Sequence, residues 1–188
     1  IPGLTAGSGA VYRIDAPGST DATSTVTAIA QDLNFPSAVA VARDGTLYYA
    51  ERPAAETGRV MRYLGPDQEP ELVADNVADP QGLAVTSNGI VYVAETGANR
   101  ISVVHSDKTV EPVISDLVEP RSLAIDEQDN LYCAEPNAGT VSKIIPSGTK
   151  QEIAVDLINP VAAGPGLVGN LFYLTAGSGL ADGTAVKV

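Results

Sequence analysis

The chain has 188 residues, of which 44% are hydrophobic and 18% are charged, and its formal net charge is −12. This composition is typical of a globular protein rather than a disordered one. The negative charge disfavours nucleic acid or an anionic membrane as a partner, and no apolar stretch approaches the ~20 residues of a membrane helix.

Taken in chain order, the sequence repeats one motif four times: a turn rich in Asp and Asn that ends in proline. The prolines follow one another at intervals of 44, 40 and 40 residues, at Pro36, Pro80, Pro120 and Pro160. A fixed period near 40 residues indicates one supersecondary unit that is used repeatedly. The fold is therefore best predicted from the repeat.

Each repeat predicts four short strands. In the first complete repeat, Ala38–Val41 and Leu47–Ala50 flank Asp44-Gly45, a dipeptide that favours a tight hairpin turn. Later runs, such as Arg59–Tyr63 and Val110–Ile114, supply third and fourth strands. No segment has a convincing helical period, and prolines and glycines interrupt the chain often.

Four antiparallel strands in about 40 residues are the spacing of a β-propeller blade. We therefore predict an all-β propeller. Small residues on the first strands, such as Ala38 and Gly82, would suit the crowded axis. Aromatic residues on the second strands would fill the space between blades. The predicted units are residues 1–35 (partial), 36–79, 80–119, 120–159 and 160–188 (partial), which together form a single propeller domain or a propeller fragment.

The two partial units predict an incomplete arc of four to five blades. Ala10–Ile14 and Val26–Ala30 would be third and fourth strands, and Ala185–Val188 a third strand without a fourth. Unpaired edge strands recruit partners by strand addition. Ala10–Ile14 and Ala185–Val188 are therefore candidates for self-association or protein binding. Two alternatives are a four-bladed ring closed by Val26–Ala30 and a piece of a larger propeller.

Residues 80–101 resemble an NHL repeat almost throughout. They read Pro80-Gln81-Gly82-Leu83-Ala84-Val85, then Asn88-Gly89-Ile90-Val91-Tyr92-Val93-Ala94-Glu95-Thr96-Gly97-Ala98-Asn99-Arg100-Ile101. The other units match less fully. The resemblance implies the propeller superfamily that includes virginiamycin B lyase-like and gluconolactonase-like proteins, which hosts binding scaffolds, lyases and lactone hydrolases.

Glu51, Glu95 and Glu135 recur at the end of the second strands. As an acidic rim around the axis they would be candidate ligands for a divalent cation such as Ca²⁺. We favour the alternative that the repeated acid caps a loop by accepting backbone N–H bonds. The proline loops add Gln81 and Arg121 as candidate ligand-binding residues, and Arg121 would bind an anion or pair with Glu119 or Glu135.

The remaining reactive side chains do not predict catalysis. His105, the only histidine, is expected in an exposed turn, and no histidine lies on a first or second strand, where lyase chemistry of the virginiamycin B type would need it. Cys133 is expected to pack in the core. We therefore predict a non-catalytic binding or assembly module outside the cytoplasm, without a cofactor. The alternative is a metal-dependent hydrolase or lyase of the gluconolactonase type with a carboxylate-lined axial site.

Overall fold

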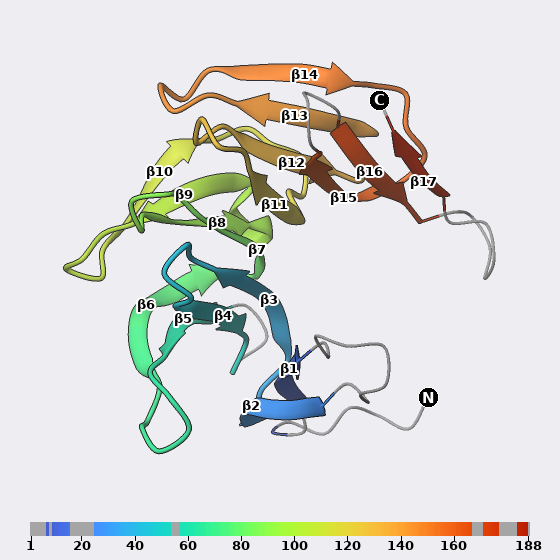
Figure 1. Cartoon of the computed structure of the whole chain (residues 1–188). Coiled ribbons are helices and arrows are strands. Elements are labelled where there is room, and N and C mark those ends of the chain that lie inside the picture. The colour runs from blue at the N-terminus through green and yellow to red at the C-terminus, as the bar shows by residue number, and fades with distance from the viewer. Residues whose placement is uncertain are drawn as a thin grey trace.

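Five antiparallel β-sheets follow one another along the chain and fan around a common line, as Figure 1 shows. The computed structural model describes residue 7 and residues 9–15, 25–53, 57–166, 171–176 and 184–187. In chain order the sheets have two, four, four, four and three strands. The prediction of an all-β propeller arc with four-stranded blades is therefore confirmed.

Consecutive strands are neighbours in every sheet, so each blade is a meander of hairpins. First strands lie nearest the common line and fourth strands lie outermost (Figure 1). The described segments contain one short 3₁₀ turn, Thr96–Ala98, and no helix long and apolar enough to cross a membrane. The strands are β1 (Gly9–Asp15) and β2 (Thr25–Leu33); β3 (Pro36–Val41), β4 (Leu47–Glu51), β5 (Thr57–Tyr63) and β6 (Glu71–Ala78); β7 (Pro80–Val85), β8 (Val91–Glu95), β9 (Arg100–Val104) and β10 (Val110–Ile114); β11 (Ser122–Ile125), β12 (Leu131–Glu135), β13 (Thr140–Ile144) and β14 (Lys150–Ala154); and β15 (Pro160–Pro165), β16 (Leu171–Thr175) and β17 (Thr184–Lys187).

The hairpins between first and second strands depend on residues that tolerate positive φ. Gly45 and Gly89 have φ values of 88° and 86°, and Asp129 has a φ of 60°. The N–H of each donates to a carbonyl three residues earlier, at 3.0–3.1 Å. Glycine adopts this conformation without a steric cost, which explains the Asp-Gly and Asn-Gly signals in the sequence.

All four proline loops share an unusual backbone. The residues four places and one place before each proline have φ values between 47° and 61°. Six of these eight residues are Asp or Asn, which tolerate the left-handed region. Phe35 and Glu119 do not, and such a conformation costs roughly 1–2 kcal/mol per residue. Other contacts must therefore hold these loops. The eight residues are Asp32, Phe35, Asn76, Asp79, Asp116, Glu119, Asp156 and Asn159.

Side chains of the second strands alternate between the two neighbouring blades. Tyr48 and Ala50 pack with Leu83 of the following blade. Tyr49, between them in sequence, packs with Leu33 of the preceding sheet. The same alternation joins the later blades. As predicted, aromatic residues of the second strands fill the space between blades. Each of the three inner blades, which are β3–β6, β7–β10 and β11–β14, is covered on both faces by its neighbours.

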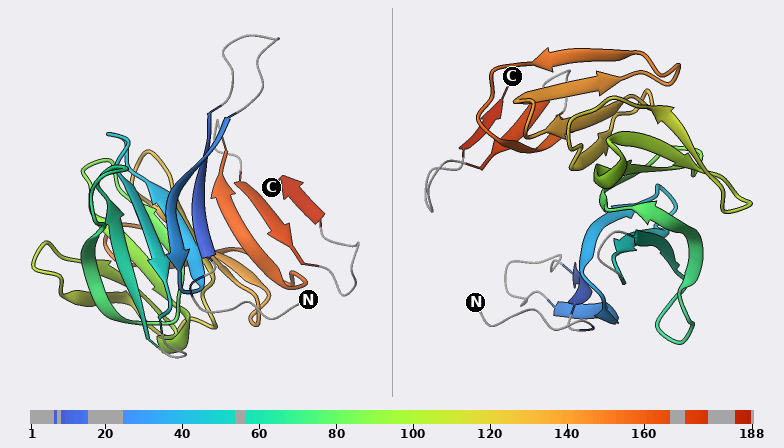
Figure 2. Two further views of the ribbon diagram at one scale, coloured as in Figure 1. Left: turned by 90° about the horizontal axis from the view of Figure 1, so that it is seen from below. Right: turned by 180° about the vertical axis from the view of Figure 1, so that it is seen from behind.

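The arc remains open among the described residues. β2 pairs with β1, and β17 pairs with β16, and neither joins the other terminal sheet. The right panel of Figure 2 shows these two sheets at opposite ends of the arc. The structure therefore does not contain the four-bladed ring, the alternative in which Val26–Ala30 would complete the last sheet. Val188, which we expected in the last strand, lies outside the described residues.

Candidate functional site

The three repeated glutamates are buried at the ends of the second strands, where Glu51, Glu95 and Glu135 are 2%, 0% and 0% exposed. Each Oε2 accepts a hydrogen bond from the backbone N–H two places before the proline that begins the same blade. The donors are Asn34, Ala78 and Val118, at 2.9, 3.0 and 2.9 Å. The acid and the proline loop are thus two halves of one contact. The expectation that the acid caps a loop is confirmed, and the contact explains how the positive-φ backbone is held.

Each carboxylate also has a basic partner. The Glu95 Oε1 accepts hydrogen bonds from the Arg100 Nε at 2.6 Å and the Ser102 hydroxyl at 2.5 Å. The charge of this buried carboxylate is therefore compensated within its own blade. In the neighbouring blades the partners are Arg59 for Glu51, at 2.7 Å, and Lys150 for Glu135, at 2.8 Å.

The protonation of Glu95 predicts how stability depends on acid. Burial alone would raise the pKa of this carboxyl, but the bonds from Arg100, Ser102 and the Ala78 N–H outweigh burial and lower its pKa below the ordinary value of 4.5. A carboxyl with a lowered pKa in the folded state contributes stability that is present above its unfolded pKa. That contribution is lost as the pH falls through the lower, folded pKa.

We therefore expect the destabilisation caused by Glu95→Gln to be largest at neutral pH and to shrink below about pH 4.5. Urea unfolding of the parent and variant chains at a series of pH values measures this difference. A difference that stays constant between neutral and strongly acidic pH would contradict the assigned role of the Glu95 charge.

These contacts bear on the predicted acidic rim. Each of the three carboxylates faces a loop and a basic residue of its own blade, rather than the other two carboxylates. In the ranges that the structure describes, no group of three or more His, Cys, Asp or Glu residues could hold a metal ion. A cation bound through Glu51, Glu95 or Glu135 would have to displace these partners.

Gln81 and Arg121, the two candidate ligand-binding residues from the proline loops, each contact a carboxylate. The Gln81 amide, on β7, donates to the Asp79 carboxylate at 2.9 Å, and Arg52 donates to the same oxygen at 2.7 Å. The Arg121 guanidinium lies 3.6 Å from the Glu119 carboxylate, with half of its side chain exposed. Arg121 thus pairs with one of the two partners that the sequence suggested.

His105 and Cys133 lie where the sequence predicted. His105 is an exposed residue in the hairpin after β9, and its Nε2 is 3.0 Å from the Glu111 carboxylate. Cys133 is fully buried among apolar side chains of two blades. Burial raises the pKa of its thiol far above the ordinary value. The thiol therefore stays protonated and packs as an apolar group.

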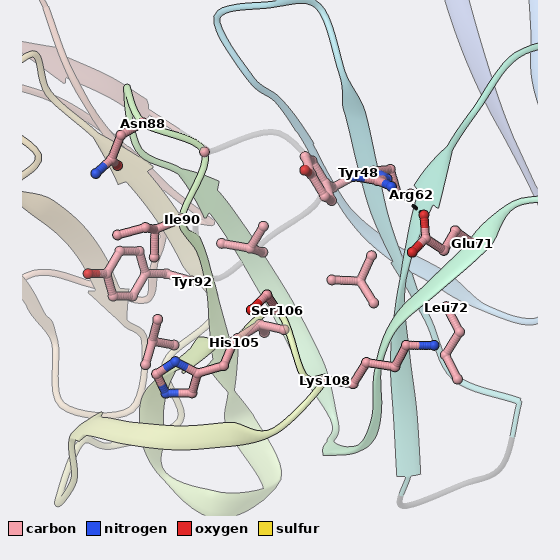
Figure 3. Close-up of a pocket in the computed structure, with 15 residues that line it drawn as sticks. Tyr48, Arg62, Glu71, Leu72, Asn88, Ile90, Tyr92, His105, Ser106 and Lys108 are labelled. Carbon is pink, nitrogen blue, oxygen red and sulfur yellow. Dashed lines mark hydrogen bonds and ion pairs between the residues drawn. The ribbon is translucent and has the colours of Figure 1, made fainter.

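Sequence reasoning missed a cavity of about 610 Å³ between the blade β3–β6 and the blade β7–β10. Figure 3 shows its labelled lining residues, which include Tyr48 and Tyr92, the pair Arg62–Glu71, and His105 and Lys108. Residues from two different repeats form it, and no motif within one repeat could reveal it.

The two ends of the arc also carry apolar residues that the inner blades would bury. On β16, Phe172 and Leu174 are 47% and 44% exposed, whereas the alanines that match Leu174 in the three inner blades are fully buried. At the other end, Tyr12, Ile14 and Val26 are 60–67% exposed. Ile14 lies directly opposite Val26 in the β1–β2 pair, so these side chains share one face.

Comparison with known proteins supports this architecture. Residues 78–104 match the family model of the NHL repeat. The sequence has no significant match among the curated proteins compared with it. The fold is similar to that in a nidogen/laminin complex, with a TM-score of 0.76 and 19% identity over 97% of this chain and 72% of that one.

Two further solved structures share the fold. Virginiamycin B lyase from Staphylococcus aureus has a TM-score of 0.61 and 17% identity, and the match covers 90% of this chain. A gluconolactonase candidate has a TM-score of 0.63 and 18% identity over 79% of this chain. The chain spans 60% of the length of each of these two proteins. The chain thus has a β-propeller fold in which residues 78–104 match the NHL repeat, and at these identities the structural likeness establishes the fold alone.

Proposed function

We propose that this chain is a non-catalytic binding and assembly module, working outside the cytoplasm, whose two open ends are completed by strands of a second copy. The observation that carries the proposal is the apolar surface at both ends of the arc, at positions that inner blades bury. The equivalent positions in the inner blades contact a neighbouring sheet, which supports another propeller sheet as the partner of these surfaces.

At the first end of the arc, the two strands of the sheet β1–β2 match the third and fourth strands of a complete blade. The side chains of β3 that would face a first strand of that sheet are uncovered, because Val39 and Val41 are 53% and 62% exposed. Their equivalents in the next blade, Leu83 and Val85, are 4% and 8% exposed. A pair of strands added beside β1 would cover these valines and complete a four-stranded blade.

At the other end, the sheet β15–β17 offers a first strand and a second strand. Its outer face carries Phe172 and Leu174, which occupy the second-strand positions that pack against a following blade elsewhere in the arc. Full burial of a side chain of this size contributes about 1.5–3 kcal/mol. Because β16 is already paired with β15 and β17, a head-to-tail contact would place the face of this sheet that carries Phe172 and Leu174 against the sheet β1–β2 of the next copy.

Light scattering coupled to size-exclusion chromatography tests this proposal. We expect the mass of the 188-residue chain to exceed the 19.3 kDa of one copy and to rise with concentration. Phe172→Glu places a charge on the contact face and should return the mass to one copy. Ile145→Glu is the matched control, because Ile145 is 39% exposed on a hairpin of an inner blade.

A chain that stays at one-copy mass at every concentration would contradict the proposal. So would a Phe172→Glu variant that associates as the Ile145→Glu control does. In the hydrolase or lyase alternative, Glu51, Glu95 or Glu135 would have to release the N–H of its proline loop and its basic partner before it could bind a cation. We favour the assembly module because it requires no such rearrangement.

A further inference from the structure

The hairpin between β7 and β8 carries Asn88 and Gly89 at its tip, at the strand ends opposite the proline loops. Asn88 is the only asparagine in the chain that a glycine follows. Residues 87–90 are exposed, and no described atom lies within 4 Å of the point where a Cβ on Gly89 would stand. The Gly89 nitrogen is therefore accessible to the Asn88 side chain and to water. The hairpin belongs to an inner blade and is separate from the two open ends of the arc.

A fixed hydroxyl group contacts the side-chain carbonyl of Asn88. The Thr86 Oγ donates to the Asn88 Oδ1 at 2.5 Å, and a longer contact from the same hydroxyl reaches the Ile90 carbonyl at 3.3 Å. Thr86 is 3% exposed, and its Oγ is held in place because it accepts the Ile90 N–H at 2.8 Å. A preorganised donor on an oxygen that becomes negative in a transition state lowers the barrier to attack on that carbonyl. The Thr86 hydroxyl can therefore assist a nucleophile that attacks the Asn88 side chain.

The matching hairpin of the preceding blade has the same turn but a different electrophile. Gly45 has a φ of 88°, close to the 86° of Gly89, and the residue before it is Asp44. The Asp44 carboxylate accepts the Thr46 N–H at 2.8 Å, and the hydrogen bonds from Thr46 lower the pKa of Asp44 below its ordinary value. An ionised carboxylate resists attack because it offers no leaving group, whereas the Asn88 amide can release ammonia.

We propose that Asn88 is a site of slow self-modification, and that the acid formed there weakens a contact between two blades. The Gly89 nitrogen loses its proton and forms a bond to the Asn88 Cγ, while the bond from Cγ to the side-chain nitrogen breaks and that nitrogen leaves as ammonia. Water then opens the resulting cyclic imide at either carbonyl and leaves aspartate or isoaspartate. The hydrogen bond from the Gly89 N–H to the Thr86 carbonyl, at 3.1 Å, must open first, which keeps the reaction slow.

The new carboxylate would stand beside a contact that joins the blades β7–β10 and β11–β14. The backbone N–H and the hydroxyl of Ser87, the residue before Asn88, donate to the Asp129 carboxylate at 3.1 and 3.4 Å. In Figure 3 the Asn88 side chain is directed away from Tyr48, which belongs to the preceding blade. A second negative charge next to this contact repels Asp129, and isoaspartate also adds a backbone carbon that disturbs the turn and its register.

Incubation of the 188-residue chain in mildly alkaline buffer, followed by peptide mass spectrometry, tests the reaction. We expect the side-chain NH₂ of Asn88 to be replaced by OH about tenfold faster than that of Asn137, because glycine leaves the attacking nitrogen unhindered. Asn137 is the internal reference, since it is also exposed but precedes an alanine. An Asn88 that stays unmodified, or that reacts no faster than Asn137, would overturn the proposal.

Two variants separate the Thr86 hydroxyl from the fold. Thr86→Val removes the donor and should slow the reaction about fivefold, whereas Thr86→Ser keeps the hydroxyl and should react as the parent does. If Thr86 only held the hairpin closed, Thr86→Val would loosen the turn and speed the reaction. In urea, where the contact is absent, the parent and Thr86→Val chains should react at the same rate. A folded Thr86→Val chain that reacts as fast as the folded parent, or faster, would refute the role of the hydroxyl.

The effect on the contact between blades is measured with Asn88→Asp, which carries the product side chain from the start. We expect its Tm to be about 1–2 °C below that of the parent, because the added charge faces a like charge. Asn137→Asp adds the same charge to another exposed turn and should keep the parent Tm. Equal Tm values for the two variants would contradict the proposed weakening.

Discussion

Replacing Glu95 with glutamine should lower the free energy of unfolding by about 3–5 kcal/mol at neutral pH, the usual cost of removing one partner of a buried ion pair. The carboxylate is fully buried and accepts bonds from Arg100, Ser102 and the Ala78 N–H. Glutamine keeps the shape but removes the charge and places an amide donor where donors already point. Urea unfolding at neutral pH measures the loss.

The matched control is Glu111→Gln, since the Glu111 side chain is 71% exposed and pairs only with His105 among the described residues. An exposed pair contributes about 0–1 kcal/mol, so this variant should unfold close to the parent. If the two variants lose similar stability, the Glu95 carboxylate does not hold the proline loop in place.

Replacing Gly82 with alanine should destabilise the chain by about 1–3 kcal/mol, as overpacking does. An added Cβ would lie 2.7 Å from the Leu123 nitrogen and 2.9 Å from the Ser122 carbonyl carbon. Both atoms belong to the backbone at the start of β11, which cannot rotate away as a side chain can. The first strands of two blades would have to separate at the axis. The Tm from thermal unfolding measures the effect.

Gly164→Ala is the control for this substitution. Gly164 also lies on a first strand, β15, but its added Cβ would meet nothing closer than the Ala124 Cβ, at 3.8 Å. We expect that variant to keep the parent Tm or to exceed it slightly, because alanine restricts the unfolded chain more than glycine does. A Gly82→Ala chain as stable as the Gly164→Ala chain would show that the first strands are not packed as tightly as the structure indicates.

Much of the fold follows from local signals in the sequence. The repeated proline, the Asp-Gly and Asn-Gly turns and the alternation in the second strands each occur within one repeat, and they fix the four-stranded unit. The tight packing at Gly82 was also predictable, because propeller axes are crowded. Phe35 and Glu119 were not predictable as left-handed residues, since their conformation depends on the carboxylate 16 residues further along the chain.

The candidate site was less predictable for a physical reason. The role of Glu95 as a cap could be inferred because the acid and its loop recur together. The cavity depends on the gap between two repeats, and such a gap has no signature in a single repeat. The exposed Phe172 and Leu174 look like ordinary strand residues in sequence, and only their place at the end of the arc gives them a role.

The most direct test of the central claim, that a second copy completes the open sheet β1–β2, is amide hydrogen exchange of Gly9–Asp15 at low and high protein concentration. We predict that exchange in this strand slows as the concentration rises, while exchange in the inner strand β8 stays unchanged. The Phe172→Glu chain should show fast exchange in β1 at both concentrations. Exchange in β1 that is independent of concentration in the parent chain would contradict the claim.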